Sequence, residues 1–411
     1  MPDTLFRSTN GLPGLGALGA DDISAMSQSA GEPGWLTEQR LAAWTFFAQA
    51  LPPVWRRTDL TQLQPETIAP LSGIQGTSIL ADDAVTRQGV VMMPLLAATK
   101  SHEALVRQYL GKAIDPMSHK FSALRAALWQ DGMLLYVPRG VEVAAPLRVT
   151  YQLADGSRAI FPYSLVILEA HAQLNLIEEY TSPDLDQPAL AGPTTEIFVG
   201  PGSHIRYASV QTWGQGIHHL GSQMIVLDRD AAGEWVSLSL GGKVQHIEAE
   251  SRMQGDGSAI NWLGATFANQ QQHLLTAPWL RHIGSNTNSL MDFKTVVSGE
   301  GYSVFDGMIK IEHESRATST RLEEHAIHLT PKARSDSIPG LKIDTNDVAK
   351  AGHASTSGQI EDEHLFYMQS RGMSQEEARR LIVMGFFDPA LQALPADDLR
   401  ERLTALIEAK I

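Results

Sequence analysis

The spacing of hydrophobic residues is helical in the first third of the chain. Leu41, Trp44, Ala48 and Leu51 recur at i, i+3, i+7 and i+10, which lines one face of a helix that Pro52 ends. Similar periods predict helices over about 101–113 and 120–129. Residues 35–130 are therefore predicted to form an N-terminal helical region with an irregular middle from about 60 to 98.

After Gly132 the period of the pattern changes from 3.6 to 2. Val236, Leu238 and Leu240 alternate with serines, as expected for a strand with one buried and one polar face. Roughly twenty such short runs follow one another without intervening helices, which favours a single all-β body over 131–355. A barrel, a propeller and a β-solenoid remain open. The lack of a blade-length repeat argues against a propeller, and a degenerate β-solenoid fits best.

The two ends of the chain follow other patterns. Residues 1–34 contain six glycines without a hydrophobic period and are predicted to be a flexible arm. The G-x-G-x-x-G spacing at 14–19 lacks the preceding strand that a dinucleotide site needs. Residues 356–411 are predicted to be helical, with a capping box at Ser374 and Glu377, a helix end at Gly385 and a last helix over about 396–409.

Composition narrows the possible functions. The chain has 411 residues, 43% of them hydrophobic, a net charge of −14 and no cysteine. It therefore has no disulfide, thiol nucleophile or thiolate ligand of its own. The acidic balance argues against nucleic acid as a partner. No signal-like N-terminus or long apolar run is found, so we expect a cytoplasmic protein that does not bind membranes.

Motifs for catalysis are missing, and three groups of histidines are the remaining candidates for chemistry. The sequence contains no P-loop, no G-x-S-x-G and no H-E-x-x-H, so ATP hydrolysis should come from another chain. His325 and His328, like the adjacent pair at 218–219, would point to opposite faces of a strand and are not expected to share a metal. His353 lies among small and hydroxylated residues that let another chain approach closely, and its imidazole is a candidate metal ligand.

The segment that contains His353 resembles the C-terminal signature of the SufB/SufD family, scaffold proteins of the SUF iron–sulfur cluster assembly system. The matching residues in this part are 347–356, 365–372 and 381–387. Further matches are Lys120–Leu124, Asp131-Gly132, Tyr136–Pro138, Tyr207, Val210–Trp213, Lys294, Asp306-Gly307 and Pro339–Ile343. These matches follow one another in order from residue 120 to residue 387, which makes the resemblance specific.

The resemblance implies a right-handed parallel β-helix core between N-terminal and C-terminal helical regions. It also implies pairing with a SufB or SufD subunit and docking of the ABC-type ATPase SufC on the C-terminal helices. SufB-type members supply a cysteine for the nascent cluster, so a chain without cysteine should be SufD-like. His353 aligns with a family histidine near the subunit interface, where a transient iron–sulfur cluster forms. No cofactor is expected to stay bound to this chain alone.

Seven residues of the C-terminal helices are predicted to dock the ATPase, because aromatic side chains beside arginine make good interface anchors. They are Phe366, Tyr367, Arg371, Gly372, Leu381, Phe386 and Phe387. The chain is thus expected to be a non-catalytic scaffold subunit. Two alternatives stay open: a stand-alone homodimeric scaffold of the same family, and a β-helix enzyme acting on carbohydrates, whose folds present carboxylates along a groove.

Overall fold

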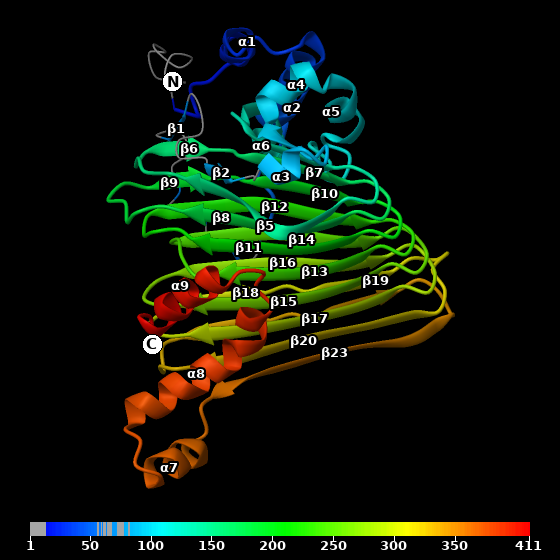
Figure 1. Ribbon diagram of the computed structural model, residues 1–411. Helices are drawn as coiled ribbons and strands as arrows, with labels where there is room; N and C mark the ends of the chain where they lie inside the picture. The colour runs from blue at the N-terminus through cyan, green and yellow to red at the C-terminus, as the bar shows by residue number, and fades with distance from the viewer. Residues whose placement is uncertain are drawn as a thin grey trace.

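The computed structural model describes residues 14–55, 57, 58, 60, 63, 68–71, 78–80 and 83–411. Figure 1 shows a stack of long strands with one group of helices at its N-terminal end and a second group that lies against its side and extends past its C-terminal end. The strands of the stack run from Gly132 to Gln359. The predicted fold class, a β-solenoid core between two helical regions, is confirmed.

The core consists of two mainly parallel sheets, and the chain passes repeatedly from one sheet to the other. Within the described residues, one sheet has nine strands: β2 (Ser78–Leu80), β5 (Glu142–Gln152), β8 (Gln173–Thr181), β11 (His204–Thr212), β13 (Ala232–Ser239), β15 (Ala259–Ala268), β17 (Asn288–Val297), β20 (Thr318–His328) and β23 (Val348–Gln359). The other has fourteen: β1 (Ala69–Pro70), β3 (Val91–Pro94), β4 (Gly132–Val137), β6 (Arg158–Ile160), β7 (Tyr163–Leu168), β9 (Ala189–Ala191), β10 (Thr194–Val199), β12 (Ile217–Leu227), β14 (Val244–Met253), β16 (His273–His282), β18 (Tyr302–Phe305), β19 (Met308–Ile311), β21 (Arg334–Ser337) and β22 (Gly340–Ile343).

The register of the nine-stranded sheet forms columns of side chains that run through the coils. One column inside the β-helix contains Tyr207, Trp235, Trp262, Met291 and Leu322, each directly opposite the next. All five are buried, and the rings of the two tryptophans stack with centroids 3.8 Å apart. Because paired residues point to the same side of a sheet, the two-residue period of the sequence becomes a continuous core.

Within the described part of the N-terminal region, six helices cover the end of the stack (Figure 1). They are α1 (Ala20–Ser29), α2 (Gly34–Gln49), α3 (Asp83–Thr86), α4 (Leu95–Ser101), α5 (Glu103–Tyr109) and α6 (Lys120–Leu128). Apart from α3, whose Val85 belongs to the core of the β-helix, these helices pack their apolar side chains with those of β4 and β7 in a second hydrophobic core, which contains Leu36, Leu95, Leu128 and Leu165. The helices predicted between 35 and 130 are therefore present, and β3 and α4 occupy part of the stretch predicted to be irregular.

Part of the predicted flexible arm is instead a packed helix. In α1 the side chain of Ile23 is almost fully buried, and α1 lies against α2. Gly19, the last glycine of the nucleotide-like spacing, precedes α1, and its N–H donates a 2.8 Å hydrogen bond to the Asp22 carboxylate. The many glycines in this segment hid the short helix. Residues 1–13 of the predicted arm lie outside the described residues.

Three helices follow the last strand: α7 (Asp362–Ser370), α8 (Gln375–Gln392) and α9 (Asp397–Glu408). The capping box is confirmed, since Ser374 accepts from the Glu377 N–H and the Glu377 carboxylate accepts in return. The predicted helix end at Gly385 was wrong: α8 continues past it and through Pro389. Buried residues on either side of Gly385, among them Val383 and Phe387, hold the helix against the core, and this packing outweighs the helix-breaking tendency of one glycine.

Helices α8 and α9 cover part of the outer face of the nine-stranded sheet. Phe387 packs on Phe267, with ring centroids 6.1 Å apart, and Leu399 and Leu403 of α9 are fully buried in the same cluster. At the end of the chain the Lys410 ammonium donates to the carbonyls of Leu240 and Phe267. Helix α7 contacts α8 and extends away from the core (Figure 1). Among the described helices, none has the length and apolar character needed to cross a bilayer.

Candidate functional site

The column of interior side chains ends at His353, on the last strand of the β-helix. His353 of β23 lies directly opposite Leu322 of β20 in the parallel register. Leu322 is fully buried, whereas His353 is exposed because no further coil covers it. His353 lines a shallow depression of about 160 Å³ together with Thr320, Arg321 and Lys350. The imidazole is thus presented at the open end of the core.

Within the described residues, His353 does not belong to any cluster of side chains that could hold a metal ion. Among the described residues, the only group of three histidine or carboxylate side chains close enough to hold a cation is formed by Asp292, Glu323 and His325. A single imidazole is one ligand, and a transition metal needs three or more. Any metal bound at His353 would therefore take its other ligands from outside the described part of this chain.

The strand that carries His353 is a long edge strand. β23 has twelve residues and pairs on one side only, with β20. Its residues from Ala351 to Gly358 are small apart from His353, and most of the strand is exposed. Unpaired backbone N–H and C=O groups along such an edge can hydrogen-bond to a strand of another chain. The small side chains leave room for that approach.

The other sequence candidates among the histidines do not form a shared site. His325 bonds Thr356 through Nδ1 at 2.7 Å, while His328 bonds Ser335 through Nε2 at 2.8 Å. This confirms that the two rings are separate. His218 and His219 are both buried, and burial lowers the pKa of His218 to about 4 and that of His219 to about 3. Both therefore stay neutral at neutral pH, His219 facing the interior of the β-helix and His218 the opposite face of β12.

A buried carboxylate inside the β-helix was not singled out in the sequence. Glu178 is fully buried and accepts hydrogen bonds from the hydroxyls of Ser164, Tyr207 and Thr195, the last at 2.9 Å. Burial raises the pKa of Glu178, and the hydroxyl donors oppose this shift. The sequence could have revealed this buried carboxylate through the two adjacent glutamates at 178 and 179, because side chains alternate along a strand and one of the two must point inward. The donors satisfy the carboxylate, so Glu178 ties neighbouring coils together.

The seven predicted docking residues divide into exposed and buried groups. Phe366 and Tyr367 of α7 are 72% and 59% exposed, and Leu381 of α8 is 50% exposed. The Arg371 guanidinium lies 5.2 Å from the Tyr367 ring. Gly372 is exposed and has a φ of 93°, in the left-handed region that favours glycine, where the chain turns from α7 to α8. Large exposed apolar side chains grouped on one element are typical of an interaction surface.

The two remaining phenylalanines lie closer to the core. Phe386 is half-buried, with the Lys294 ammonium 5.6 Å from its ring centroid. Phe387 is fully buried between α8 and the β-helix. In contrast to the expectation from the sequence, Phe387 therefore offers no surface to a partner and instead anchors α8.

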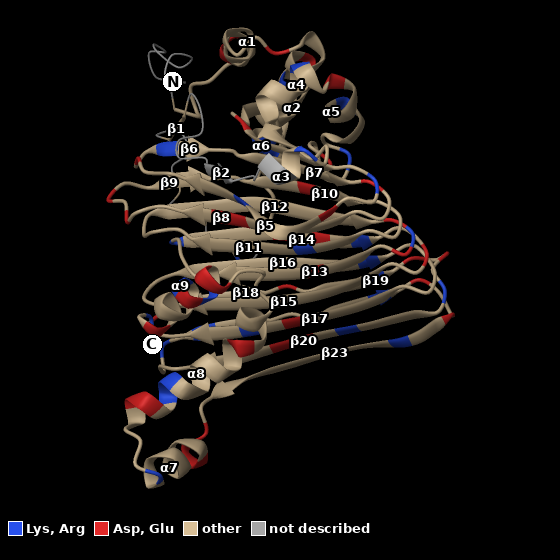
Figure 2. Ribbon diagram, in the orientation of Figure 1, with Lys and Arg blue, Asp and Glu red and all other residues tan. Residues whose placement is uncertain are grey.

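Charge does not single out one face of the C-terminal helices. Residues 361–411 contain ten acidic and six basic side chains, a net charge of −4. Helices α8 and α9 each contain both acidic and basic residues, whereas α7 contains acidic ones without Lys or Arg (Figure 2). The exposed aromatic residues of α7 thus distinguish this region more clearly than its charge does.

Comparisons with known proteins agree with the fold and with the resemblance noted above. Residues 151–386 match the family described as "SUF system FeS cluster assembly, SufBD core domain", and residues 59–149 match the "SufBD protein N-terminal region". The core match alone covers more than half of the 411 residues. It includes His353 and most of α8.

Individual relatives do not distinguish the two subunit types. The chain is 29% identical to the iron–sulfur cluster assembly protein SufB of Bacillus subtilis over 75% of this chain and 66% of that one. It is also 29% identical to SufD of Bacillus subtilis, over 79% of this chain and 74% of that one. A SufBD family protein of Staphylococcus epidermidis is 25% identical over 96% and 92% of the two chains. On the strength of the two family matches and the β-helix that carries them, the chain belongs to the SufBD family of the SUF iron–sulfur cluster assembly system.

Proposed function

We propose that the chain is a SufD-like scaffold subunit of a cytoplasmic SufBCD complex. In this proposal it performs no catalysis itself: it pairs with a SufB-type subunit and binds a SufC-type ABC ATPase. The observation that carries the subtype is the combination of a SufBD core with a complete lack of cysteine. A nascent cluster needs thiolate or sulfide chemistry, which must then come from the partner.

We place the contact with the partner subunit at the open end of the β-helix. β23 exposes one backbone edge over twelve residues and carries His353 on the side of the core interior. A SufB-type subunit that added its own strand to this edge would bring its side chains opposite the imidazole. The cluster would then form as transient cargo between His353 and the thiolate of the partner, rather than as a group resident in this chain.

We place the binding site for the ATPase on the C-terminal helices. Phe366 and Tyr367 project from α7, which itself contacts α8 but lies away from the core, and Leu381 extends the apolar surface onto α8. Phe387 connects α8 rigidly to the β-helix. Motion imposed on α7 and α8 by a nucleotide-driven ATPase dimer would therefore be transmitted to the core.

The proposal is tested by purifying the chain with an affinity tag at native expression and identifying its partners by mass spectrometry. We expect an ABC-type ATPase and a paralogue that contains cysteine in the same complex. Native mass of the untagged chain tests the homodimeric alternative. Recovery of a homodimer without these partners would overturn the heteromeric assignment and leave the stand-alone scaffold.

A further inference from the structure

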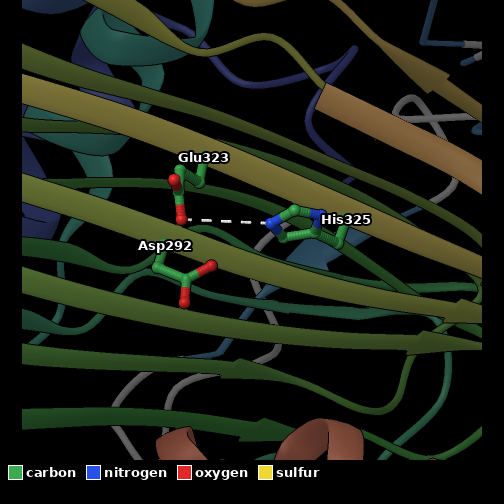
Figure 3. Close-up of side chains that lie close together, drawn as sticks. All are labelled: Asp292, Glu323 and His325. Atoms are coloured by element: carbon green, nitrogen blue, oxygen red, sulfur yellow. Dashed lines mark ion pairs between the residues drawn. The ribbon is translucent and has the colours of Figure 1, made fainter. Parts of the chain in front are cut away.

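A second group of metal-binding side chains lies on the outer face of the β-helix, away from His353. Asp292 of β17 is directly opposite Glu323 of β20, and His325 follows two residues later on the same face. One ligand atom from each residue lies within 4.8 Å of the other two, and the His325 Nε2 is 4.0 Å from a Glu323 oxygen. Figure 3 shows the three side chains converging on one space.

The orientation of His325 favours coordination through Nε2. Its Nδ1 is 2.7 Å from the hydroxyl of Thr356 on β23, so the other nitrogen faces the two carboxylates. A hydrogen bond of this kind from the distal nitrogen fixes the ring orientation and tautomer of many metal-binding histidines. All three ligand side chains are between 19% and 29% exposed, which leaves a path for an ion.

In the structure, two basic side chains form ion pairs with the carboxylates of the site. The Lys294 ammonium lies 2.9 Å from Asp292, and the Arg321 guanidinium pairs with Glu323. With a neutral imidazole, these four charges cancel. A cation that bound here would replace Lys294 beside Asp292 and gain the imidazole as a third ligand. The Arg321–Glu323 pair is the more exposed of the two and is a weak competitor, whereas the Lys294–Asp292 pair is the one that a cation has to displace.

From this geometry we infer that Asp292, Glu323 and His325 form a binding site for a divalent first-row transition cation such as Mn²⁺, Fe²⁺ or Zn²⁺. One imidazole with two carboxylates suits these ions, whereas Mg²⁺ and Ca²⁺ prefer oxygen ligands alone. The site joins three neighbouring strands, since Thr356 belongs to the edge strand β23. Binding there would brace the edge on the face opposite the imidazole of His353.

The inference is tested by titrating the untagged full-length chain with Zn²⁺ in a calorimeter, and with Mn²⁺ by electron paramagnetic resonance. We expect one saturable equivalent, which His325→Ala and Glu323→Gln remove. Thr356→Val should weaken binding about tenfold, the usual effect of losing the group that orients a ligand. Lys294→Met should strengthen binding roughly fivefold, because a competing positive charge is removed.

His328→Ala is the matched control, since it removes another histidine of β20 that bonds elsewhere. Circular dichroism checks that each variant is folded. X-ray absorption of the Zn²⁺ complex should show one imidazole among oxygen ligands. Unchanged binding in folded His325→Ala, or no saturable binding by the parent chain, overturns the site. These outcomes leave the scaffold proposal intact, because none of them involves a partner subunit.

Discussion

His353 occupies the same interior register position as Leu322, one coil further along the β-helix. The leucine is covered by its neighbours, and the histidine is the exposed end of the column. This relationship gives His353 two properties at once: a backbone position fixed by strand pairing and a side chain open to a partner. A surface loop could offer the second property but not the first.

The edge of β23 can be tested with proline at two adjacent positions, Ala354→Pro and Ser355→Pro. Successive backbone N–H groups of a strand point to opposite edges, so one substitution removes a bond to β20 and the other faces the open edge. We expect one variant to lower the thermal stability of the isolated chain and the other to leave it unchanged but abolish pairing with the partner. Thermal melts and native mass spectrometry give the two readouts.

If both proline variants keep native pairing, β23 is not the subunit interface. If both destabilise the isolated chain to the same degree, the strand is not an open edge. The comparison therefore needs no knowledge of the partner structure.

Substitutions in the C-terminal helices should affect either ATPase binding or the stability of the fold, depending on whether the side chain is exposed or buried. Phe366→Ala should change the unfolding free energy of the chain by less than about 0.5 kcal/mol, because the ring is 72% exposed, and should weaken ATPase binding. Phe387→Ala should cost about 3–5 kcal/mol, because it empties a buried position between α8 and the core. Denaturant unfolding and calorimetric binding to the ATPase measure the two effects. Strong ATPase binding by Phe366→Ala would remove α7 from the docking surface.

Because several histidines are buried, we expect the unfolding free energy of the chain to fall in mild acid. Burial lowers the pKa of His219 and His282 to about 3, and that of His218 and His246 to about 4. Each ring takes up a proton near pH 6.5 only when the chain is unfolded. The stabilising contribution of each neutral ring is therefore complete above pH 6.5 and is lost progressively as the pH falls toward the folded-state value.

At pH 5 each of these histidines has lowered the unfolding free energy by about 2 kcal/mol relative to its value above pH 6.5. Replacing one of them, as in His219→Phe, should reduce the loss of unfolding free energy between pH 7 and pH 5 by about that amount. Urea unfolding at both values measures the difference, whatever the absolute effect of the substitution. An unchanged pH dependence would mean that His219 is protonated in the folded chain.

Local sequence patterns predicted which strands and helices form better than they predicted where these elements end. Alternation such as that around Val236 fixed the strands, and the capping box at Ser374 fixed the start of α8. The end of α8 could not be predicted, because burial of Phe387 against a distant strand outweighs Gly385. For the same reason α1 was missed: Ile23 is held by tertiary packing and not by a local period.

The candidate sites differ in how far the sequence could reveal them. His353 was visible through its small neighbours and the family resemblance, but its place at the end of a core column depends on register. Asp292 lies one coil, 31 residues, before Glu323, so only the folded pairing brings the two carboxylates together. The sequence correctly separated His325 from His328, yet it gave no sign that His325 would face Asp292.

The central claim is that His353 serves a cluster assembled between two subunits, and His353→Ala in the purified complex tests it most directly. Native mass, iron and acid-labile sulfide are measured on the same sample after anaerobic assembly. The account predicts an intact complex of unchanged mass whose iron and sulfide contents fall several-fold, because the exposed imidazole supports no other part of the fold. Full iron and sulfide contents in an intact variant complex would contradict it.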